Sequence, residues 1–502
     1  MVSKKFFFLF SILMSVVGTK ALAYDVAVEN ADGVTIYYNY ISDGAALEVT
    51  YKANDYNSYS GSVVIPEEVS DQGTVRKVTG IGMGAFYECY DLASVTLPTC
   101  VTTIGDYAFG RSGLTSLTIP ASVTSIGYWT LQECNDIDAI SVEAGNTKYD
   151  SRNNCNAIIE TETNTLIAGC KNTVIPASVT AIGEVAFYHC DLTSITIPAA
   201  VTTIGAYAFM ACTRLPSVTL PDGLTSIGKY AFGGCRGLTS ITIPNSASDI
   251  GEGVFIDCTG LTSITLPEGM ISIPDFLLQN CSGLTSFTFP SGVTSIGESA
   301  FYDCTGLTSI TFPAGITRIA SFAFDSCTGL TAITIPSGVT IIEDHVFNMC
   351  SGLTSVTLHD GVTSIGSAAF STCERLTSIT LPASLTSIDS RAFWRCENLM
   401  EVISKIEEPF TIKKLTFDNK TVANGTLYVP AGTIAKYQAT EAWNTFANIK
   451  EGTPSSISQV GRDESKILKR YTIDGNKITA SKNGINIIQM ENGVVKKVVV
   501  RK

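Results

Sequence analysis

Prolines and cysteines recur at one fixed spacing of 23 residues along most of this 502-residue chain, and this regularity limits the fold more than any other feature. The prolines on this lattice, with His359 at the one node that lacks proline, are Pro198, Pro221, Pro244, Pro267, Pro290, Pro313, Pro336 and Pro382. The cysteines on it are Cys212, Cys235, Cys258, Cys281, Cys304, Cys327, Cys350, Cys373 and Cys396. Two residue types with a single period indicate a repeat protein in which each unit is one turn of a solenoid.

Each unit predicts its own local structure. The unit that begins at Leu238 reads LTSITIPNSASDIGEGVFIDCTG, and the spacing of Leu238, Ile241 and Ile243 predicts a short strand with three aliphatic side chains facing inward. Most units continue with Val-Thr-Ser-Ile-Gly, which predicts a second short strand. Phe and Cys then follow three residues apart, a spacing typical of one helical turn. We expect such coils to stack, because no coil can bury its apolar edge alone.

The residues that face inward in these coils are aromatic rings and thiols. Seven phenylalanines lie three residues before a lattice cysteine and should form a continuous internal stack: Phe232, Phe255, Phe301, Phe324, Phe347, Phe370 and Phe393. The chain has 15 cysteines, and we expect most to be buried free thiols that act as small apolar fillers. Disulfides are the alternative in an exported chain, and the bridge that we expect in that case joins Cys155 and Cys170.

The N-terminus has the layout of a secretory signal. Lys4 and Lys5 precede an apolar run at residues 6–17 and small residues at 21–23, so residues 1–23 are expected to be cleaved on export. The apolar run is shorter than the ~20 residues that span a bilayer, and no transmembrane segment is expected. We therefore expect a protein that is secreted or displayed on the outer-membrane surface.

Breaks in the lattice divide the chain. Between Pro120 and Pro176 a surplus of residues predicts an inserted hairpin, and Asp474-Gly475 and Asn492-Gly493 predict hairpins near the C-terminus. The expected parts are a signal (1–23), an N-terminal cap with the first coil (24–78), the solenoid (79–398) with its insertion at about 143–172, a C-terminal cap (399–450), a linker (451–469) and a small β module (470–502).

The repeated motif resembles a known family. It is close to L-x-x-I-x-I-P-x-x-V-x-x-I-G-x-x-A-F-x-x-C from about residue 63 to 398, and this resembles the BspA-like leucine-rich-repeat proteins of bacterial surfaces. The resemblance implies a β-rich leucine-rich-repeat solenoid, with two short parallel strands and a helical turn per repeat of 22 to 23 residues, that serves as an adhesin. The tail is similar to the sorting module of type IX secretion substrates, and a simple terminal β cap is the alternative.

Catalytic patterns are missing from the sequence. The chain has three histidines, His189, His345 and His359, and no standard zinc, serine-hydrolase or phosphate-loop motif. We therefore expect no enzyme activity, no metal site and no cofactor. The net charge of -13 also argues against nucleic acid as a partner, since phosphate binding needs clustered Lys and Arg.

One strand position suggests a binding surface. Serine and threonine alternate on the outward side of the first strand, which predicts an uncharged face lined by hydroxyl groups. The candidate binding residues are Tyr128, Trp129, Ser240, Thr242, Ser263, Thr265, Ser286, Thr288, Ser309 and Thr311. The alternative is a solvated surface that repeats because the units were duplicated. The function hypotheses are an adhesin for extracellular proteins or cells, a surface glycan-binding protein and a passive spacer.

Overall fold

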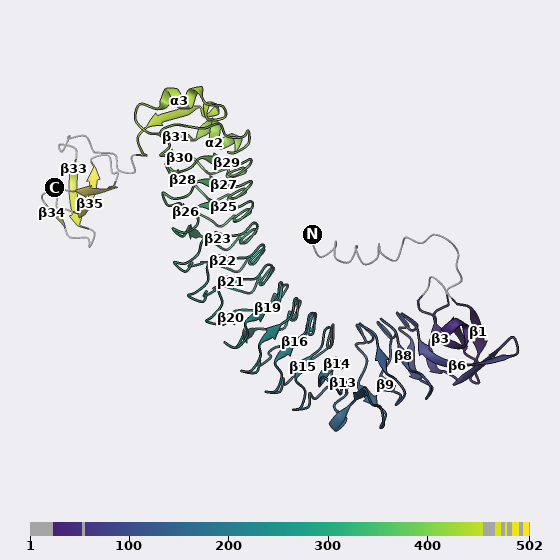
Figure 1. Cartoon of the computed structure of the whole chain (residues 1–502). Coiled ribbons are helices and arrows are strands. Elements are labelled where there is room, and N and C mark those ends of the chain that lie inside the picture. The colour runs from purple at the N-terminus through teal and green to yellow at the C-terminus, as the bar shows by residue number, and fades with distance from the viewer. Residues whose placement is uncertain are drawn as a thin grey trace.

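The computed structural model describes residues 24–52 and 56–454, together with the backbone of four strands near the C-terminus. The chain forms a long, curved solenoid of stacked coils (Figure 1). The four terminal strands pair antiparallel in the order β34-β33-β35-β36. They are β33 (Ile467–Thr472), β34 (Lys477–Ile478), β35 (Gly484–Met490) and β36 (Val495–Val500). The predicted signal, most of the predicted linker and the two Gly-containing hairpin turns of the tail lie outside the described residues.

Two columns of short parallel strands form two sides of the solenoid, as the sequence predicts. The strands of the first face are β4 (Gly61–Val64), β7 (Leu92–Thr96), β9 (Ser116–Ile119), β11 (Ala139–Val142), β18 (Ser240–Thr242), β20 (Ser263–Thr265), β24 (Ala332–Thr334), β26 (Ser355–Thr357), β28 (Ser378–Leu381), β30 (Glu401–Ser404), β31 (Thr426–Val429) and β32 (Asn448–Glu451). In Figure 1, β26 and β28 lie toward the outer side of the curve, and β25 and β27 of the second face toward the inner side.

The second face has shorter strands that pair in strict register. Its strands are β6 (Thr74–Ile81), β8 (Thr103–Ile104), β10 (Ser125–Ile126), β15 (Ala181–Ile182), β16 (Thr203–Ile204), β17 (Ser226–Ile227), β19 (Asp249–Ile250), β21 (Ser272–Ile273), β22 (Ser295–Ile296), β23 (Arg318–Ile319), β25 (Ile341–Ile342), β27 (Ser364–Ile365) and β29 (Ser387–Ile388). Ile204 pairs with Ile227, and Ile227 pairs with Ile250. This register places the isoleucines one above another inside the solenoid.

In most coils the third side runs from a glycine after the second strand to the lattice cysteine. In the coil at residues 205–212, Cys212 donates to the carbonyl of Phe209 (3.2 Å), a bond of the kind that a tight helical turn makes. Tyr207 and Ala211 have φ values of 57° and 60°, so the turn cannot continue as a helix. Alternate amides instead bond to the next coil, as Phe209 does to Ala231 (2.7 Å). The third sides therefore form a hydrogen-bonded ladder of their own.

The predicted phenylalanine stack is confirmed. The rings of Phe301, Phe324 and Phe347 are fully buried, with centroids 5.0 and 5.6 Å apart and nearly parallel planes. Leu131 and Leu278 occupy the ring position in two coils, so the stack is interrupted there. Beyond Leu278, Phe287 packs edge-on against Phe301 at 4.8 Å and restores aromatic contact.

The cysteines are free thiols in the structure. The thiol of Cys235 donates to the carbonyl of Phe209 in the preceding coil (3.1 Å), and the same pattern recurs at Cys258, whose acceptor is the carbonyl of Phe232. The expected bridge between Cys155 and Cys170 is not formed. The thiol of Cys155 faces the carbonyl of Ala157 (3.7 Å) and that of Cys170 the carbonyls of Asp138 and Asn156, so each sulfur has a backbone partner instead.

Caps close both ends of the solenoid core. At the N-terminus the antiparallel strands β1 (Val26–Glu29), β2 (Thr35–Ile41) and β3 (Ala46–Thr50), the short helix η1 (Ser42–Gly44) and strand β5 (Glu68–Asp71) surround β6. At the other end lie the helices α2 (Asn419–Asn424), α3 (Ile434–Ala439) and η3 (Trp443–Thr445). The Trp443 ring is fully buried and packs on Phe417 at 5.8 Å, so it covers the last ring of the stack. Such caps protect the apolar ends that stacking would otherwise expose.

The insertion divides the core. It consists of β12 (Tyr149–Asp150), the short helix η2 (Arg152–Asn154), β13 (Ala157–Glu160) and β14 (Thr165–Gly169), and it lies where the solenoid bends in Figure 1. Ile158 packs into the N-terminal core, whereas its neighbour Ile159 packs into the C-terminal core. Since neighbouring strand residues point to opposite sides, β13 forms a wall between the two cores.

Candidate functional site at the bend

One coil of the solenoid lacks a third side. Leu166 of β14 pairs with Ile182 of β15, so the two residues hold equivalent places in successive coils. From Ile182 to the next lattice proline, Pro198, the chain advances 16 residues, but from Leu166 to Pro176 it advances only 10. The coil that contains β14 is therefore six residues shorter on its return path and cannot build the segment that its neighbours have.

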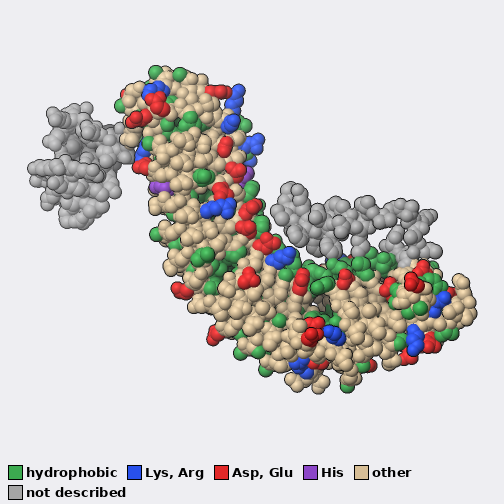
Figure 2. Space-filling model, viewed as in Figure 1, with side chains coloured by type: hydrophobic (Ala, Val, Ile, Leu, Met, Phe, Trp, Pro, Cys, Tyr) green, Lys and Arg blue, Asp and Glu red, His purple; other side chains and the backbone are tan. Residues whose placement is uncertain are grey.

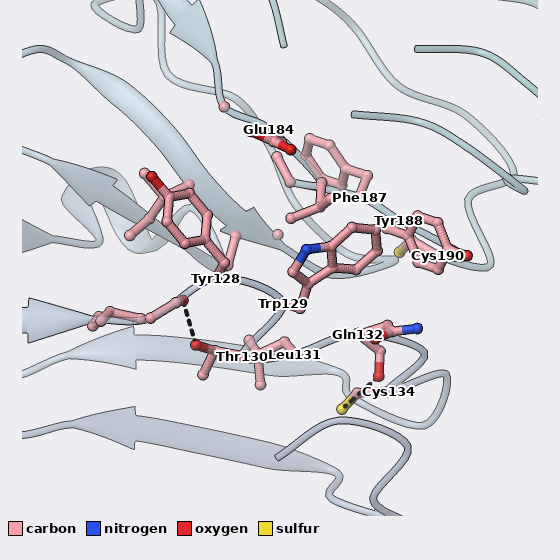
Figure 3. Close-up of a pocket in the computed structure, with 18 of the residues that line it drawn as sticks. Tyr128, Trp129, Thr130, Leu131, Gln132, Cys134, Glu184, Phe187, Tyr188 and Cys190 are labelled. Atoms are coloured by element: carbon pink, nitrogen blue, oxygen red, sulfur yellow. Dashed lines mark hydrogen bonds between the residues drawn. The ribbon is translucent and has the colours of Figure 1, made fainter. Parts of the chain in front are cut away.

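A cavity of about 300 Å³ occupies the place of the missing segment. One wall is residues 126–132 with Cys134, the other is residues 183–190, and residues 167–169 also line the cavity. We call this cavity and its lining the slot (Figure 3). Its volume is at the lower end of the range for ligand-binding clefts.

The hydrogen-bonded ladder of the third sides is open at the slot. In the coil before it, Phe109 donates to Thr130 (3.0 Å), and in the coil after it, Phe187 donates to Ala208 (2.7 Å). Within the described residues, the backbone amides of Trp129, Leu131 and Glu133 donate no hydrogen bond.

The opposite wall of the slot has free acceptors. Gly169 donates to the carbonyl of Ala186 (2.9 Å). The carbonyls of Glu184 and Tyr188 accept no hydrogen bond from any residue that the structure describes. The slot thus presents a row of backbone donors on one wall and backbone acceptors on the other.

Aromatic rings lie at the slot. The ring of Trp129 meets the edge of Tyr188 at a centroid distance of 4.7 Å and lies 6.0 Å from the ring of Tyr207 (Figure 3 shows Trp129 beside Tyr188). Trp129 also stacks on Tyr107 at 6.1 Å, with planes 13° apart. Figure 2 shows hydrophobic side chains gathered on the inner side of the bend.

These contacts belong to a longer row of rings. The row, which we call the aromatic strip, consists of half-buried side chains: Tyr56, Tyr87, Tyr107, Trp129, Tyr188, Tyr207 and Tyr230. Burial raises the pKa of Tyr188 and of Tyr230 to about 12, so both phenols stay protonated at neutral pH. A protonated phenol can both donate and accept a hydrogen bond.

Carboxylates give the slot a negative character. Arg111 forms ion pairs with Glu88 and Glu133, at 3.0 Å in each case, and Glu133 carries one of the unbonded amides. Glu160 and Glu184 also line the slot, and neither forms an ion pair with any described residue. The site therefore favours a neutral or basic partner.

The structure separates the predicted binding residues into two places. Tyr128, whose side chain is 67% exposed, and Trp129 both line the slot. The other eight lie on the first face and are all exposed: Ser240, Thr242, Ser263, Thr265, Ser286, Thr288, Ser309 and Thr311. Residues 286–288 and 309–311 are not in regular strands, so this face is a broken sheet.

Sequence reasoning missed the second wall of the slot. Tyr188 and Glu184 are more than 50 residues beyond Trp129 in the chain, and only the folding of the insertion brings them together. The available signal was the short distance from the hairpin to Pro176, which leaves no room for a Gly-x-x-Ala-Phe segment. That count becomes readable only once the pairing of Leu166 with Ile182 shows where the coil ends.

The described residues show no arrangement suited to catalysis by a metal. No group of three or more His, Cys, Asp or Glu side chains in this part of the chain could hold a metal ion. Nδ1 of His345 is a buried atom without a hydrogen-bond partner in the described structure, and its ring stacks on Phe322 at 4.6 Å. The ring therefore fills space in the outer wall of a coil.

Comparison with known proteins identifies the repeats. Residues 72–167, 180–307 and 271–400 match the BspA type leucine rich repeat region in six copies, which together span more than half of the chain. The chain belongs to the BspA type leucine-rich-repeat family. This confirms the fold that the motif implied, and proteins with such repeats are typically binding scaffolds without catalytic activity.

One solved structure agrees with this BspA-type fold, and a second matches the chain in sequence. A leucine-rich repeat protein from Bacteroides ovatus is 28% identical, with a TM-score of 0.55, and the match covers 86% of this chain and 100% of that one. A leucine-rich repeat protein from Eubacterium ventriosum is 21% identical over 73% of this chain and 94% of its own, with a TM-score of 0.32. No curated protein matches the chain.

Proposed function

We propose that this BspA-type protein works at the cell surface, or after secretion, as an adhesin that binds an extracellular protein through the aromatic strip. The observation that carries the proposal is the strip itself, because Tyr and Trp supply much of the binding energy at protein interfaces at a small cost in side-chain entropy. A curved solenoid also offers an extended surface of the kind that repeat proteins use for binding.

The stacking of the rings favours protein over sugar at the strip. The planes of Tyr207 and Tyr230 are 12° apart at 5.4 Å, and those of Tyr107 and Trp129 are nearly parallel as well. In these two pairs each ring turns a face toward its neighbour, so a sugar ring cannot stack on those faces. The exposed edges and hydroxyl groups suit the polar and apolar contacts of a protein surface.

Glycan binding on the first face is the second candidate. The hydroxyl groups of Thr242 and Thr265 are exposed and make no hydrogen bond within the described residues, unlike Thr262, whose hydroxyl donates to the carbonyl of Thr239 (3.0 Å). Free hydroxyl groups in a row can bond to sugar hydroxyls. This surface faces the outer side of the curve, away from the strip.

The location is part of the same proposal. No helix among the described residues is long and apolar enough to cross a membrane. We propose that residues 1–23 direct export and that residues 470–502 act as a sorting module. Mass spectrometry of the surface-exposed protein should find Tyr24 as the first residue; an N-terminus that retains residues 1–23 would contradict the signal.

The binding test compares the two surfaces directly. The exported protein is applied to arrays of extracellular-matrix proteins and of glycans, as the native chain and as two triple variants. Replacing Tyr107, Tyr207 and Tyr230 by Ala should weaken binding to the captured protein at least tenfold. The matched control replaces Thr242, Thr265 and Thr288 by Ala and should bind that protein like the native chain. Retention by glycans alone, lost in the threonine variant, would overturn the proposal in favour of the second candidate.

A further inference from the structure

We infer that the slot binds an extended peptide segment of the partner protein, which lies between the two walls in the place of the missing third side. The inference rests on the proposed function and names the part of the partner that is recognised. It follows from three independent features of the slot: its open backbone groups, the shape and polarity of its lining and its position on the strip.

The backbone groups of the slot fit an extended chain. The free amides of Trp129, Leu131 and Glu133 are spaced by two residues, as are the alternate groups that an extended peptide turns to one side. Opposite them lie the free carbonyls of Glu184 and Tyr188. An inserted segment could bond along the three amides of the first wall, like a strand added to an exposed edge. On the second wall only the carbonyls of Glu184 and Tyr188 are open, because Gly169 already donates to Ala186 between them.

The closed third sides elsewhere in the solenoid show that a segment can bond to the coil before it and the coil after it at once. The segment at residues 205–212, for example, accepts at Ala208 from Phe187 and donates from Phe209 to Ala231, at 2.7 Å in both bonds. A peptide in the slot would repeat the contacts with the first wall, while Gly169 keeps the bond to Ala186 on the second. The solenoid itself therefore supplies the template for the ligand.

The side chains around the slot restrict the sequence of that peptide. Leu131, Ala168 and Phe187 form an apolar floor where the phenylalanine stack is interrupted, which suits one apolar side chain pointing inward. Glu160 and Glu184 line the same slot without ion pairs among the described residues, which suits Lys or Arg beside that apolar residue. The partner segment is accordingly extended, with an inward apolar residue and a basic neighbour.

Hydrogen exchange with a designed probe tests the inference. The probe is an eight-residue peptide, GAYAFKAC, which has the chain's own third-side sequence from residues 205–212 with lysine in place of Met210, and a scrambled peptide is its control. Measured by mass spectrometry on the exported protein under reducing conditions, exchange at residues 127–134 should slow at least tenfold when the probe binds. Exchange at residues 105–112, where the ladder is closed, should not change.

A variant that fills the slot provides the second test. Six residues with the sequence GAYAFM are inserted after Ala168 to complete the third side of the short coil, and the control carries the same insertion after Gly145, which lies in the loop that leads into the hairpin. The filled variant should lose binding of the probe, and the control should keep it.

The outcomes separate this inference from the proposed function. If the probe leaves residues 127–134 unchanged, or if these amides are already protected in the free protein, the slot takes no external peptide and the inference is wrong. A partner protein that still binds the strip in that case leaves the proposed function standing. If the filled variant does not fold, the exchange experiment on the native chain still decides the question.

Discussion

At the scale of single residues, the lattice cysteines do more than fill space. The carbonyl of Phe209 accepts from the amide of Cys212 in its own coil and from the thiol of Cys235 in the next coil. The sequence predicted the period and the burial of these thiols, because both follow from spacing. It could not predict the sulfur-to-carbonyl bond, which depends on how far apart two stacked turns lie.

Thiol reactivity should report this burial. Burial raises the pKa of Cys235 and of Cys304 to about 12, so at pH 8 neither carries a reactive thiolate in the folded protein. We expect the half-buried Cys100 to be alkylated first under native conditions, and all 15 cysteines to react after unfolding without reductant. Fewer than ten reactive thiols in the unfolded protein would show that disulfides had formed.

Gly228, which follows strand β17, lies close against the coil before it, although Pro274, Ala320, Glu343 and Asp389 hold the equivalent place in other coils. A Cβ atom on Gly228 would lie 2.4 Å from the amide nitrogen of Ala206 in the coil before it. Replacing Gly228 by Ala should therefore lower the free energy of unfolding by about 2 kcal/mol or more, because backbone must move. Gly269, where an added Cβ has no neighbour within 4 Å, is the control, and Gly269→Ala should change the denaturant midpoint little. Equal effects of the two substitutions would contradict this account of the packing.

At the scale of elements, the insertion shows how far the sequence could go. The lattice surplus predicted a hairpin between Pro120 and Pro176, and the structure has β13 and β14 in that stretch. The slot could not be predicted from the lattice count, because the residues added by the hairpin conceal the residues that are missing after it. Residues are added before β14 but are missing after it, and only the pairing of Leu166 with Ile182 shows where one coil ends and the next begins.

The candidate binding residues divide in the same way. Tyr128 and Trp129 could be proposed from the sequence, since aromatic residues are prominent in a chain with so many Ser and Thr. Their partners across the slot could not, because Tyr188 belongs to an ordinary repeat and has no unusual neighbours in the sequence. A site formed where two coils fail to meet is specified by topology rather than by a motif.

At the scale of the whole molecule, the chain has two cores separated by a wall. The N-terminal core includes Phe109, and the C-terminal core includes Phe347. Stacked repeats are stabilised mainly by contacts with their neighbours, so an interrupted contact divides the solenoid into two cooperative units. Figure 1 shows the bend at the same place, between an N-terminal arm that contains the first core and a C-terminal arm that contains the second.

Unfolding in denaturant should therefore have two transitions. Truncating a buried Phe to Ala costs about 3–5 kcal/mol. We expect Phe109→Ala to lower only the midpoint of the N-terminal arm and Phe347→Ala only that of the C-terminal arm, as followed by hydrogen exchange at increasing denaturant concentration. A single transition that both variants shift by the same amount would show one continuous core instead.

The slot exists only if one coil lacks its third side and leaves the hydrogen-bonded ladder open. Hydrogen exchange of the free exported protein tests this directly by comparing residues 127–134 with the closed segments at 105–112 and 205–212. Unbonded amides exchange from the folded state, so the account predicts that the amides of Leu131 and Glu133 exchange at least a hundredfold faster than those of Phe109 and Phe209. Equal protection of all three segments would contradict it.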